Sequence, residues 1–213
     1  MSAILGIDTS GAIAGVAVYD GRVLAEITWR SGRQHSKTLL ASVDRALGLS
    51  GVDRASLGAI ALASGPGSYS GLRVGASTAI GLGLALQVPV VRVPTLEVIA
   101  YSATPGAGTL RPAIEVGRGR YASARYLRTE SGVEERSDLV SADFAGLVEL
   151  ASAEDALLIG DFTAEEMEQH GAARVATNAA GMRRPGFLAE LAARVIGNGD
   201  PTAEGAGQLI YLA

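Results

Sequence analysis

Short apolar runs and amphipathic stretches alternate along the first half of the chain. Apolar or alternating runs between turn signals indicate strands, whereas apolar residues at helical spacing indicate helices. The pattern predicts three antiparallel strands, a helix, a buried strand, a second helix and a fifth strand, in the order βββαβαβ. These elements are expected at Ala3–Ile7, Ile13–Tyr19, Arg22–Arg30, Gln34–Leu47, Ile60–Ala63, Gly71–Leu86 and Val90–Val93.

A similar order restarts after a joint rich in Gly, Pro and Thr at Thr104–Thr109. It predicts a hairpin, a third strand, a helix capped by Ser141, a buried strand and two final helices. Their expected positions are Pro112–Val116, Tyr121–Arg128, Gly132–Arg136, Asp143–Ala151, Ala156–Gly160, Ala164–Gln169 and Pro185–Ile196. The chain is therefore predicted to be an α/β protein of two tandem βββαβα subdomains, residues 1–103 and 110–213.

The segment Gly65-Pro66-Gly67-Ser68-Tyr69-Ser70-Gly71-Leu72-Arg73-Val74-Gly75 connects a predicted buried strand to a helix that Ser70 would cap. Backbone N–H groups at the start of a helix attract anions, so a phosphate cradle is one interpretation. The glycine spacings of the known mononucleotide and dinucleotide loops are absent, however. We favour a structural turn that leads into a packing helix.

Small residues recur at every fourth position along that helix, at Gly71, Gly75, Ala79 and Gly83. Each glycine inside a helix costs up to about 1 kcal/mol relative to alanine, so a compensating close contact is expected. The contact is either with the chain's own sheet or with a helix of a partner. The sequence leaves both alternatives open.

Composition narrows the classes of function. The chain has 213 residues, 48% of them apolar, with a formal charge of −4 and no cysteine. Disulfides, thiolate metal sites and a cysteine nucleophile are excluded, and no basic run favours nucleic acid. The two histidines, His35 and His170, are far apart, so they predict no joint metal site. Without a predicted leader or membrane span, we expect a cytoplasmic protein.

Several motifs together resemble a known family. They are Ile7-Asp8-Thr9-Ser10, His35-Ser36 with Leu39-Leu40, the glycine-rich segment, and Pro94-Thr95-Leu96. With the tandem element order, they resemble the actin/hexokinase/Hsp70 (ASKHA) superfamily of ATP-binding proteins and, within it, the TsaB (YeaZ) family. The resemblance covers the first hundred residues closely and the remainder loosely. It implies two tandem ribonuclease H-like (actin-like ATPase) subdomains.

The resemblance also implies a function. Members of this family act as non-catalytic scaffold or activating subunits for a TsaD-type catalytic relative. The product is N6-threonylcarbamoyladenosine at position 37 of tRNAs that read ANN codons. A TsaE-type ATPase is a further expected partner, tRNA is contacted only through the complex, and the subunit self-associates when its partner is absent.

Two positions bear on catalysis. Where the catalytic relative has two histidines four apart on a helix that hold a metal, this chain has Thr95 and Ile99. Neither side chain replaces an imidazole. We therefore expect no catalytic residue, no metal and negligible ATPase activity in the isolated protein. The expected cofactor is none, although the resemblance leaves weak nucleotide binding open.

Asp8, Thr9 and Ser10 are the candidates for a vestigial nucleotide site, because in kinases of this superfamily such a carboxylate helps to place Mg²⁺. The alternative, which we favour, is an Asx turn that satisfies backbone N–H groups after the strand. Glu115 is the nearest candidate for a second acid. The expected partner surface is the first pair of helices, with His35, Leu39, Leu40, Val43, Leu47, Gly71, Arg73, Gly75, Ala79 and Gly83.

The second half departs from the family pattern. The usual Asp-Ala-Arg and nearby Glu of its hairpin are here Glu115-Val116-Gly117 and Arg120, and the usual terminal Pro-x-Tyr-Leu-Arg is here Leu209–Ala213. The main rival function is a small kinase or ATPase of the same superfamily that acts alone, and the short chain argues against it. A ribonuclease H-like nuclease is a second rival, but the strand that ends near Ser64 offers no carboxylate for two-metal chemistry.

Overall fold

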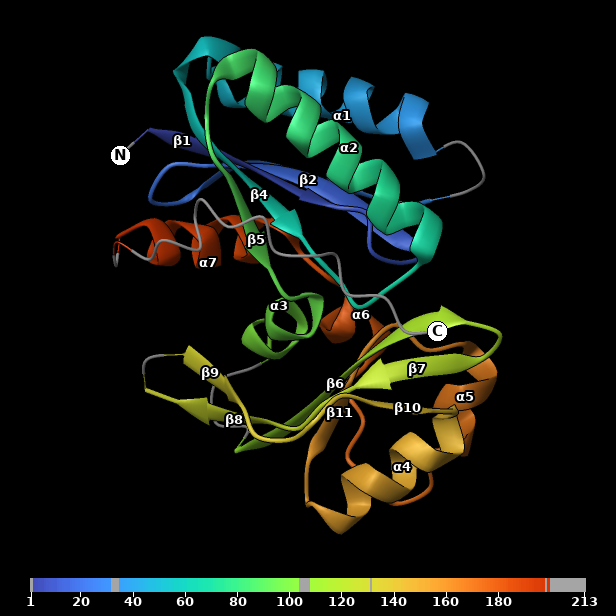
Figure 1. The fold of residues 1–213 in the computed structure, drawn as a ribbon. Coiled ribbons are helices and arrows are strands. Elements are labelled where there is room, and N and C mark those ends of the chain that lie inside the picture. Colours follow the sequence, from blue (N-terminus) through green and yellow to red (C-terminus); the bar gives the residue numbers. More distant parts are fainter. Residues whose placement is uncertain (1, 32–34, 104–107, 131, 198, 200–213) are drawn as a thin grey trace.

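In the computed structural model, which describes residues 2–31, 35–103, 108–130, 132–197 and 199, two β-sheets lie in separate halves of the molecule (Figure 1). The first sheet has the order β3-β2-β1-β4-β5. Its antiparallel β1–β3 meander and its parallel β1, β4 and β5 confirm the predicted order. The strands are β1 (Ala3–Asp8), β2 (Ile13–Tyr19), β3 (Val23–Arg30), β4 (Leu57–Ala63) and β5 (Val90–Val93).

Helices cover both faces of the first sheet. α1 (His35–Ser50) and α2 (Tyr69–Leu86) pack on one face, against alternate residues such as Leu5 and Ile7. α7 (Pro185–Gly197) packs on the other face, against Ile4 and its neighbours. The period of two along β1 sends its side chains to both cores, which explains why the strand is apolar throughout.

The second sheet is built around β6, in the order β10-β7-β6-β8-β9, with β11 also paired to β6. Tyr121–Arg128, predicted as one strand, is divided into β7 and β8, which pair with β6 in one antiparallel register. β7 pairs with the second half of β6 and β8 with its first residues, and the ladder is interrupted between them at Ala124 and Arg125. The strands are β6 (Thr109–Gly117), β7 (Arg120–Ser123), β8 (Tyr126–Thr129), β9 (Gly132–Glu135), β10 (Val140–Ala142) and β11 (Leu157–Ile159).

Each half of the chain contributes a helix to the other half of the molecule. α3 (Thr95–Tyr101) packs on β6 and β9 of the second sheet, and α7 returns to the first. The division into 1–103 and 110–213 stays a prediction, and residues 104–107 of the predicted joint lie outside the described residues. The remaining helices are the 3₁₀ turn Arg54–Ser56, α4 (Phe144–Ala153), α5 (Ala164–Gln169) and α6 (Asn178–Gly181). Among the described helices, none is both long and apolar enough to cross a membrane.

Two of the predicted helix caps are wrong. α2 is capped by Ser68, whose hydroxyl accepts a hydrogen bond from the N–H of Gly71, rather than by Ser70. α4 is capped by Asp143, whose carboxylate accepts from Gly146 N–H at 2.9 Å, rather than by Ser141. In both cases the residue immediately before the helix provides the oxygen, as capping geometry requires.

The end of α1 also differs from the prediction. The helix continues through Gly48 to Ser50, and Gly51 follows it with a φ of 69°. A left-handed glycine after the last helical residue is a common helix terminator. The sequence offers two glycines three residues apart, and periodicity alone pointed to the first.

The small residues of α2 face the chain's own sheet. A Cβ atom on Gly71 would clash with the carbonyl oxygen of Thr9, and one on Gly75 would clash with the Thr9 hydroxyl. Gly83 lies against Val90, and Ala79 is fully buried. The partner-helix alternative is therefore wrong for this face, because the close approach that it needs is already made inside the molecule.

We predict that two glycine-to-alanine changes on α2 have opposite effects. Gly71→Ala should lower the free energy of unfolding by about 1–3 kcal/mol, because the methyl group overpacks the contact with Thr9. Gly81→Ala should raise it by up to about 1 kcal/mol, because a Cβ there meets no atom and alanine favours the helix. Urea unfolding followed by circular dichroism measures both. Equal effects of the two changes would contradict this packing.

Candidate functional site

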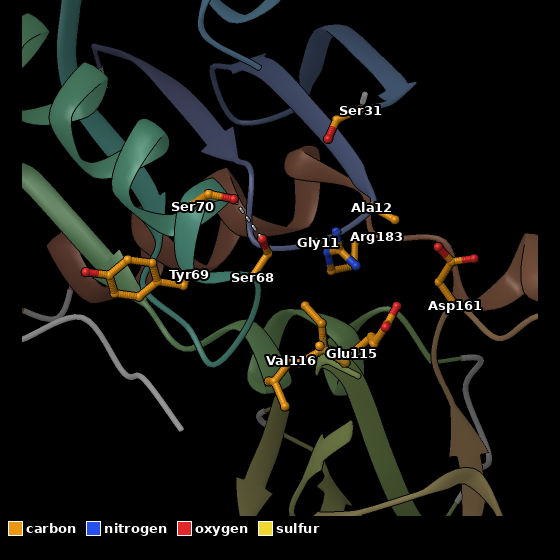
Figure 2. Close-up of a pocket in the computed structure, with 12 residues that line it drawn as sticks. Gly11, Ala12, Ser31, Ser68, Tyr69, Ser70, Glu115, Val116, Asp161 and Arg183 are labelled. Carbon is orange, nitrogen blue, oxygen red and sulfur yellow. Dashed lines mark hydrogen bonds between the residues drawn. The ribbon is translucent and has the colours of Figure 1, made fainter. Parts of the chain in front are cut away.

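A cleft of about 430 Å³ opens between the two halves of the molecule. The carboxyl ends of β1, β6 and β11 lead into it, and such ends are where open α/β sheets place their ligands. Figure 2 shows Arg183 between the loop of Gly11 and Ala12 on one side and Glu115 and Asp161 on the other. The lining residues are Gly11, Ala12, Ser31, Ser68, Tyr69, Ser70, Ile114, Glu115, Val116, Gly117, Asp161 and Arg183.

Asp8 ends β1 beneath this cleft, and its side chain is only 2% exposed. One carboxylate oxygen, Oδ1, accepts hydrogen bonds from the backbone N–H of Ser10 at 2.9 Å and from the Ser10 hydroxyl at 2.6 Å. This contact is the Asx turn that the sequence favoured. The turn fixes the direction in which the chain leaves the strand.

The other oxygen of Asp8 is paired with Arg183. Arg183 Nε donates to Asp8 Oδ2 at 3.0 Å, and Nη2 donates to the carbonyl of Ile13. The guanidinium lies against Gly11, where a Cβ atom would come within 2.8 Å of Nη2. The Arg183 side chain is 4% exposed, so this is a buried ion pair at the floor of the cleft.

Thr9 and Ser10 are also used inside the fold. The Thr9 hydroxyl donates to the carbonyl of Gly71 at 2.7 Å, and Ser10 donates to Asp8. Both residues are buried. The three residues predicted as a vestigial nucleotide site therefore have side chains committed to the protein, and it is the following Gly11 and Ala12 that line the cleft.

Three N–H groups of the glycine-rich segment also donate to acceptors inside the protein. Gly65 N–H donates to the Thr95 hydroxyl at 3.1 Å, Ser68 N–H to the carbonyl of Ser10 at 2.7 Å, and Gly71 N–H to Ser68. A phosphate cradle needs such groups aimed at the ligand. The geometry agrees with the structural turn.

Two carboxylates face the cleft, Glu115 from β6 and Asp161 just after β11. Asp161 is paired at 3.6 Å with Arg30, whose side chain is 72% exposed and therefore screened by water. Because Arg183 is already neutralised by Asp8, a polyphosphate in the cleft would meet uncompensated negative charge. The residues of the cleft do not fit the nucleotide that the superfamily resemblance implies.

Glu115 was predicted from the sequence, whereas Asp161 and Arg183, which also line the cleft, were not. The acidic residue directly after a buried strand, at its carboxyl end, was a usable signal for Asp161. Arg183 lies 175 positions from Asp8 in a segment without periodicity, so no local signal could have paired them.

The two positions at which the resemblance implies metal ligands in the catalytic relative are occupied here by buried side chains of the fold. Thr95 is fully buried, and its backbone N–H also donates to the carbonyl of Gly65 at 2.7 Å. Ile99 is 1% exposed in the core of the second half. Within the described part of the chain, no three His, Cys, Asp or Glu side chains gather closely enough to hold a metal. The side chain of His35 lies outside the described residues, and His170 ends α5.

The predicted partner surface divides into an inner and an outer set. Leu39, Val43 and Leu47 are buried in the first core together with Ala79, and Gly71, Gly75 and Gly83 of α2 are buried as well. On the outer side, Leu40, Ile80 and Leu84 are 51%, 41% and 76% exposed, and the Arg73 guanidinium stacks over Tyr69 at 5.3 Å. The outer set also borders a groove of about 450 Å³ formed by Ile80, Gly83, Leu84, Gln87, Val88 and Val90.

Glu97 of α3 lies near a second carboxylate, that of Glu135 on β9. Burial, together with the charge of Glu135 on β9, raises the pKa of Glu97 above its usual value. The Tyr126 hydroxyl donates to Glu135 at 3.3 Å, and burial and the two carboxylates raise the pKa of Tyr126. Two carboxylates thus share a partly buried site between α3 and the β8–β9 hairpin.

The family model of TsaD, tRNA N6-adenosine threonylcarbamoyltransferase, matches residues 22–182. The chain is 35% identical over 133 residues to "tRNA threonylcarbamoyladenosine biosynthesis protein TsaB" of Escherichia coli, covering 61% of this chain and 57% of that protein. It is 32% identical over 124 residues to the protein of the same name from Bacillus subtilis, covering 58% and 54%. The matched stretch thus spans about half the length of these relatives.

Among solved structures, an uncharacterized protein from Pseudomonas aeruginosa with similarity to peptidase YEAZ superposes with a TM-score of 0.80. The two are 25% identical, and the alignment covers 100% of both chains. The likeness extends over both halves, and with the two sheets it bears out the predicted pair of ribonuclease H-like subdomains.

We predict that Glu97→Gln stabilises the protein only above the usual pKa of glutamate. Because the folded-state pKa is raised, the folded protein holds this proton more tightly than the unfolded chain. The stability that the protonated Glu97 side chain contributes is complete at low pH and is lost as pH rises through its folded-state pKa. Urea unfolding at about pH 4 and pH 8 should show a gain for the variant at the higher pH alone. Glu149→Gln, on the exposed face of α4, is the matched control, and an equal gain at both values would contradict the assignment.

Proposed function

The chain belongs to the TsaD family of tRNA N6-adenosine threonylcarbamoyltransferases, and from this premise we propose that it takes part in forming N6-threonylcarbamoyladenosine in tRNA. Its similarity to proteins named TsaB favours the role of a scaffold or activating subunit without catalysis of its own. The modified position is adenosine 37 of tRNAs that read ANN codons. The proposed place of action is the cytoplasm.

The observation that carries this proposal is that two side chains of α3, Thr95 and Ile99, serve the fold. Thr95 holds the glycine-rich loop through two hydrogen bonds, and Ile99 packs in the second core. Both positions serve the fold, so neither can be exchanged for a metal ligand without loss of those contacts. A subunit with this helix needs a relative that carries the catalytic metal.

The cleft supports the same conclusion. Its first-strand carboxylate is neutralised by an internal arginine, and its remaining carboxylates oppose a polyphosphate. A kinase or ATPase that acts alone would need a cation and phosphates at this place. The geometry therefore favours the scaffold over the small-molecule kinase.

The proposed partner is a TsaD-type catalytic subunit, and the proposed docking surface is the outer face of α1 and α2. Several large apolar side chains exposed on neighbouring helices are typical of protein interfaces. Leu40, Ile80 and Leu84 would be its apolar part, with the Tyr69–Arg73 stack beside them. Self-association through the same face, a TsaE-type ATPase as a further partner, and tRNA contact only within the complex complete the proposal.

Reconstitution tests the function directly. With the TsaD-type and TsaE-type relatives from the same organism, ATP and a supplied activated threonylcarbamoyl donor, modification of tRNA should fall at least about tenfold when this chain is omitted, a loss of about 1.4 kcal/mol in transition-state stabilisation. The isolated chain should neither modify tRNA nor hydrolyse ATP. The modified nucleoside is quantified by mass spectrometry. Unchanged modification without the chain, or ATP turnover by the chain alone at about 1 s⁻¹ or faster, would overturn the proposal.

The interface has its own prediction. Leu84→Glu should weaken binding to the TsaD-type relative at least about tenfold, because it places a charge in the apolar part of the contact. Leu127→Glu, at an exposed leucine on β8 in the other half, is the matched control and should leave the affinity unchanged. Titration calorimetry measures both, and circular dichroism verifies the fold. An unaffected Leu84→Glu variant would exclude this surface.

A further inference from the structure

Residues 178–186, which we call the strap, run from one half of the molecule to the other and place Arg183 at the floor of the cleft. They comprise α6 and the start of α7, and α6 lies between the two halves in Figure 1. The segment leaves the second sheet after β11 and arrives at the first sheet where Arg183 reaches Asp8.

At its first end the strap is fixed to the second half. The Asn178 side chain donates through Nδ2 to the carbonyl of Phe162 at 2.7 Å and accepts through Oδ1 from Phe162 N–H at 3.1 Å. Gly181 lies so close to the backbone of Gly160 that a Cβ atom there would clash with it. Phe162 is itself part of the core formed with α4.

At its other end the strap is fixed to the first half by two arginines. Arg183 pairs with Asp8 at the end of β1. Arg184 donates through Nε to Glu26 of β3 at 2.9 Å, and the other oxygen of Glu26 accepts from Gly186 N–H at 2.8 Å. Asn178 and Gly186 are thus close together in sequence, yet each is hydrogen-bonded to a different half of the molecule.

The Asp8–Arg183 pair is the more deeply buried of the two ion pairs that anchor the strap. Both side chains are nearly inaccessible to water, at 2% and 4%, and Asp8 keeps its bonds to Ser10 at the same time. Removing one member of a buried pair leaves an unpaired charge in the protein, which is strongly unfavourable. The exposed Arg30–Asp161 pair, which also bridges the cleft, is screened by solvent and contributes little by comparison.

We propose that the strap is a permanent internal bridge, in which the Arg183 guanidinium takes the place of a ligand-borne cation beside Asp8. The two halves then keep one relative orientation without any molecule in the cleft. The packing of α3 against α7, where the Tyr101 hydroxyl donates to Glu190 at 2.7 Å, joins the halves at a second place. The strap governs the separation at the cleft, because its Arg183 anchor lies in the cleft lining.

Spin labels can measure the orientation, since the chain has no native cysteine. Single cysteines replace Arg45, exposed on α1, and Glu149, exposed on α4. The labelled protein is diluted with unlabelled protein, so that only pairs within one molecule contribute. Electron–electron resonance then gives the distribution of distances between the two halves.

Three variants of the labelled protein separate the strap from general stability. Asp8→Asn with Arg183→Met removes the ion pair while leaving no unpaired charge, and the amide oxygen introduced in place of the carboxylate can still accept from Ser10. Asn178→Ala releases the other end without changing any charge. Arg174→Met is the matched control, because Arg174 is half-exposed and pairs with Asp155 within the second half.

We expect the double variant and Asn178→Ala to shift or broaden the distance distribution by more than about 2 Å, the scale of hinge rearrangements, while Arg174→Met leaves it unchanged. If the double variant does not fold, Asn178→Ala alone decides. A folded Asn178→Ala variant with the parent's distribution would overturn the proposal.

Ligand addition provides an independent readout. About 1 mM Mg²⁺–ATP should leave the distribution and the melting temperature of the parent unchanged, because the place of the cation is filled by Arg183. Narrowing of the parent distribution by Mg²⁺–ATP would show that a ligand still joins the halves, and it would contradict the proposal. None of these measurements depends on tRNA modification, so their failure is distinguishable from failure of the proposed function.

Discussion

A charge buried in a protein must be paired, and the carboxylate of Asp8 imposes this constraint on the centre of the molecule. One of its oxygens fixes the turn at Ser10, and the other holds Arg183. Through these two contacts a single residue at the end of β1 determines where the next loop runs and where a segment 175 positions away returns. The floor of the cleft between the two sheets is built from this pairing.

The glycines of the loop and of α2 follow from the same geometry. Once the Asx turn has fixed the backbone at Thr9 and Ser10, the carbonyls of these residues point at the start of α2. Gly67 and Gly71 are needed there because any side chain would clash with those carbonyls. The inner face of α2 is thus fully used by its own sheet. A partner can contact only the outer face, where the apolar side chains are exposed.

The sequence predicted what depends on local order and missed what depends on distant contacts. Periodicity located the strands of the first sheet and the helices at Ala164–Gln169 and Pro185–Gly197, because each buries one face or both. It could not show that the strand after Tyr121 is interrupted at Ala124 and Arg125, since no glycine or proline marks the break. It located Asp8 and Glu115 but could not supply the partner of Asp8. Arg183 lies in an irregular segment, and its contact with Asp8 forms only when the chain is folded.

The internal counterion also bears on why a subunit of this fold would serve as a scaffold. A ligand can shift a conformational equilibrium only by the difference in its affinity for the two states. A nucleotide that bridges two halves has such a difference, because the open state lacks half of its contacts. In the proposed bridge, Arg183 makes those contacts as part of the chain and at no loss of translational freedom. A ligand would then have little effect on the equilibrium between open and closed arrangements of the two halves. The outer face of α1 and α2 is held in one fixed orientation relative to the second half.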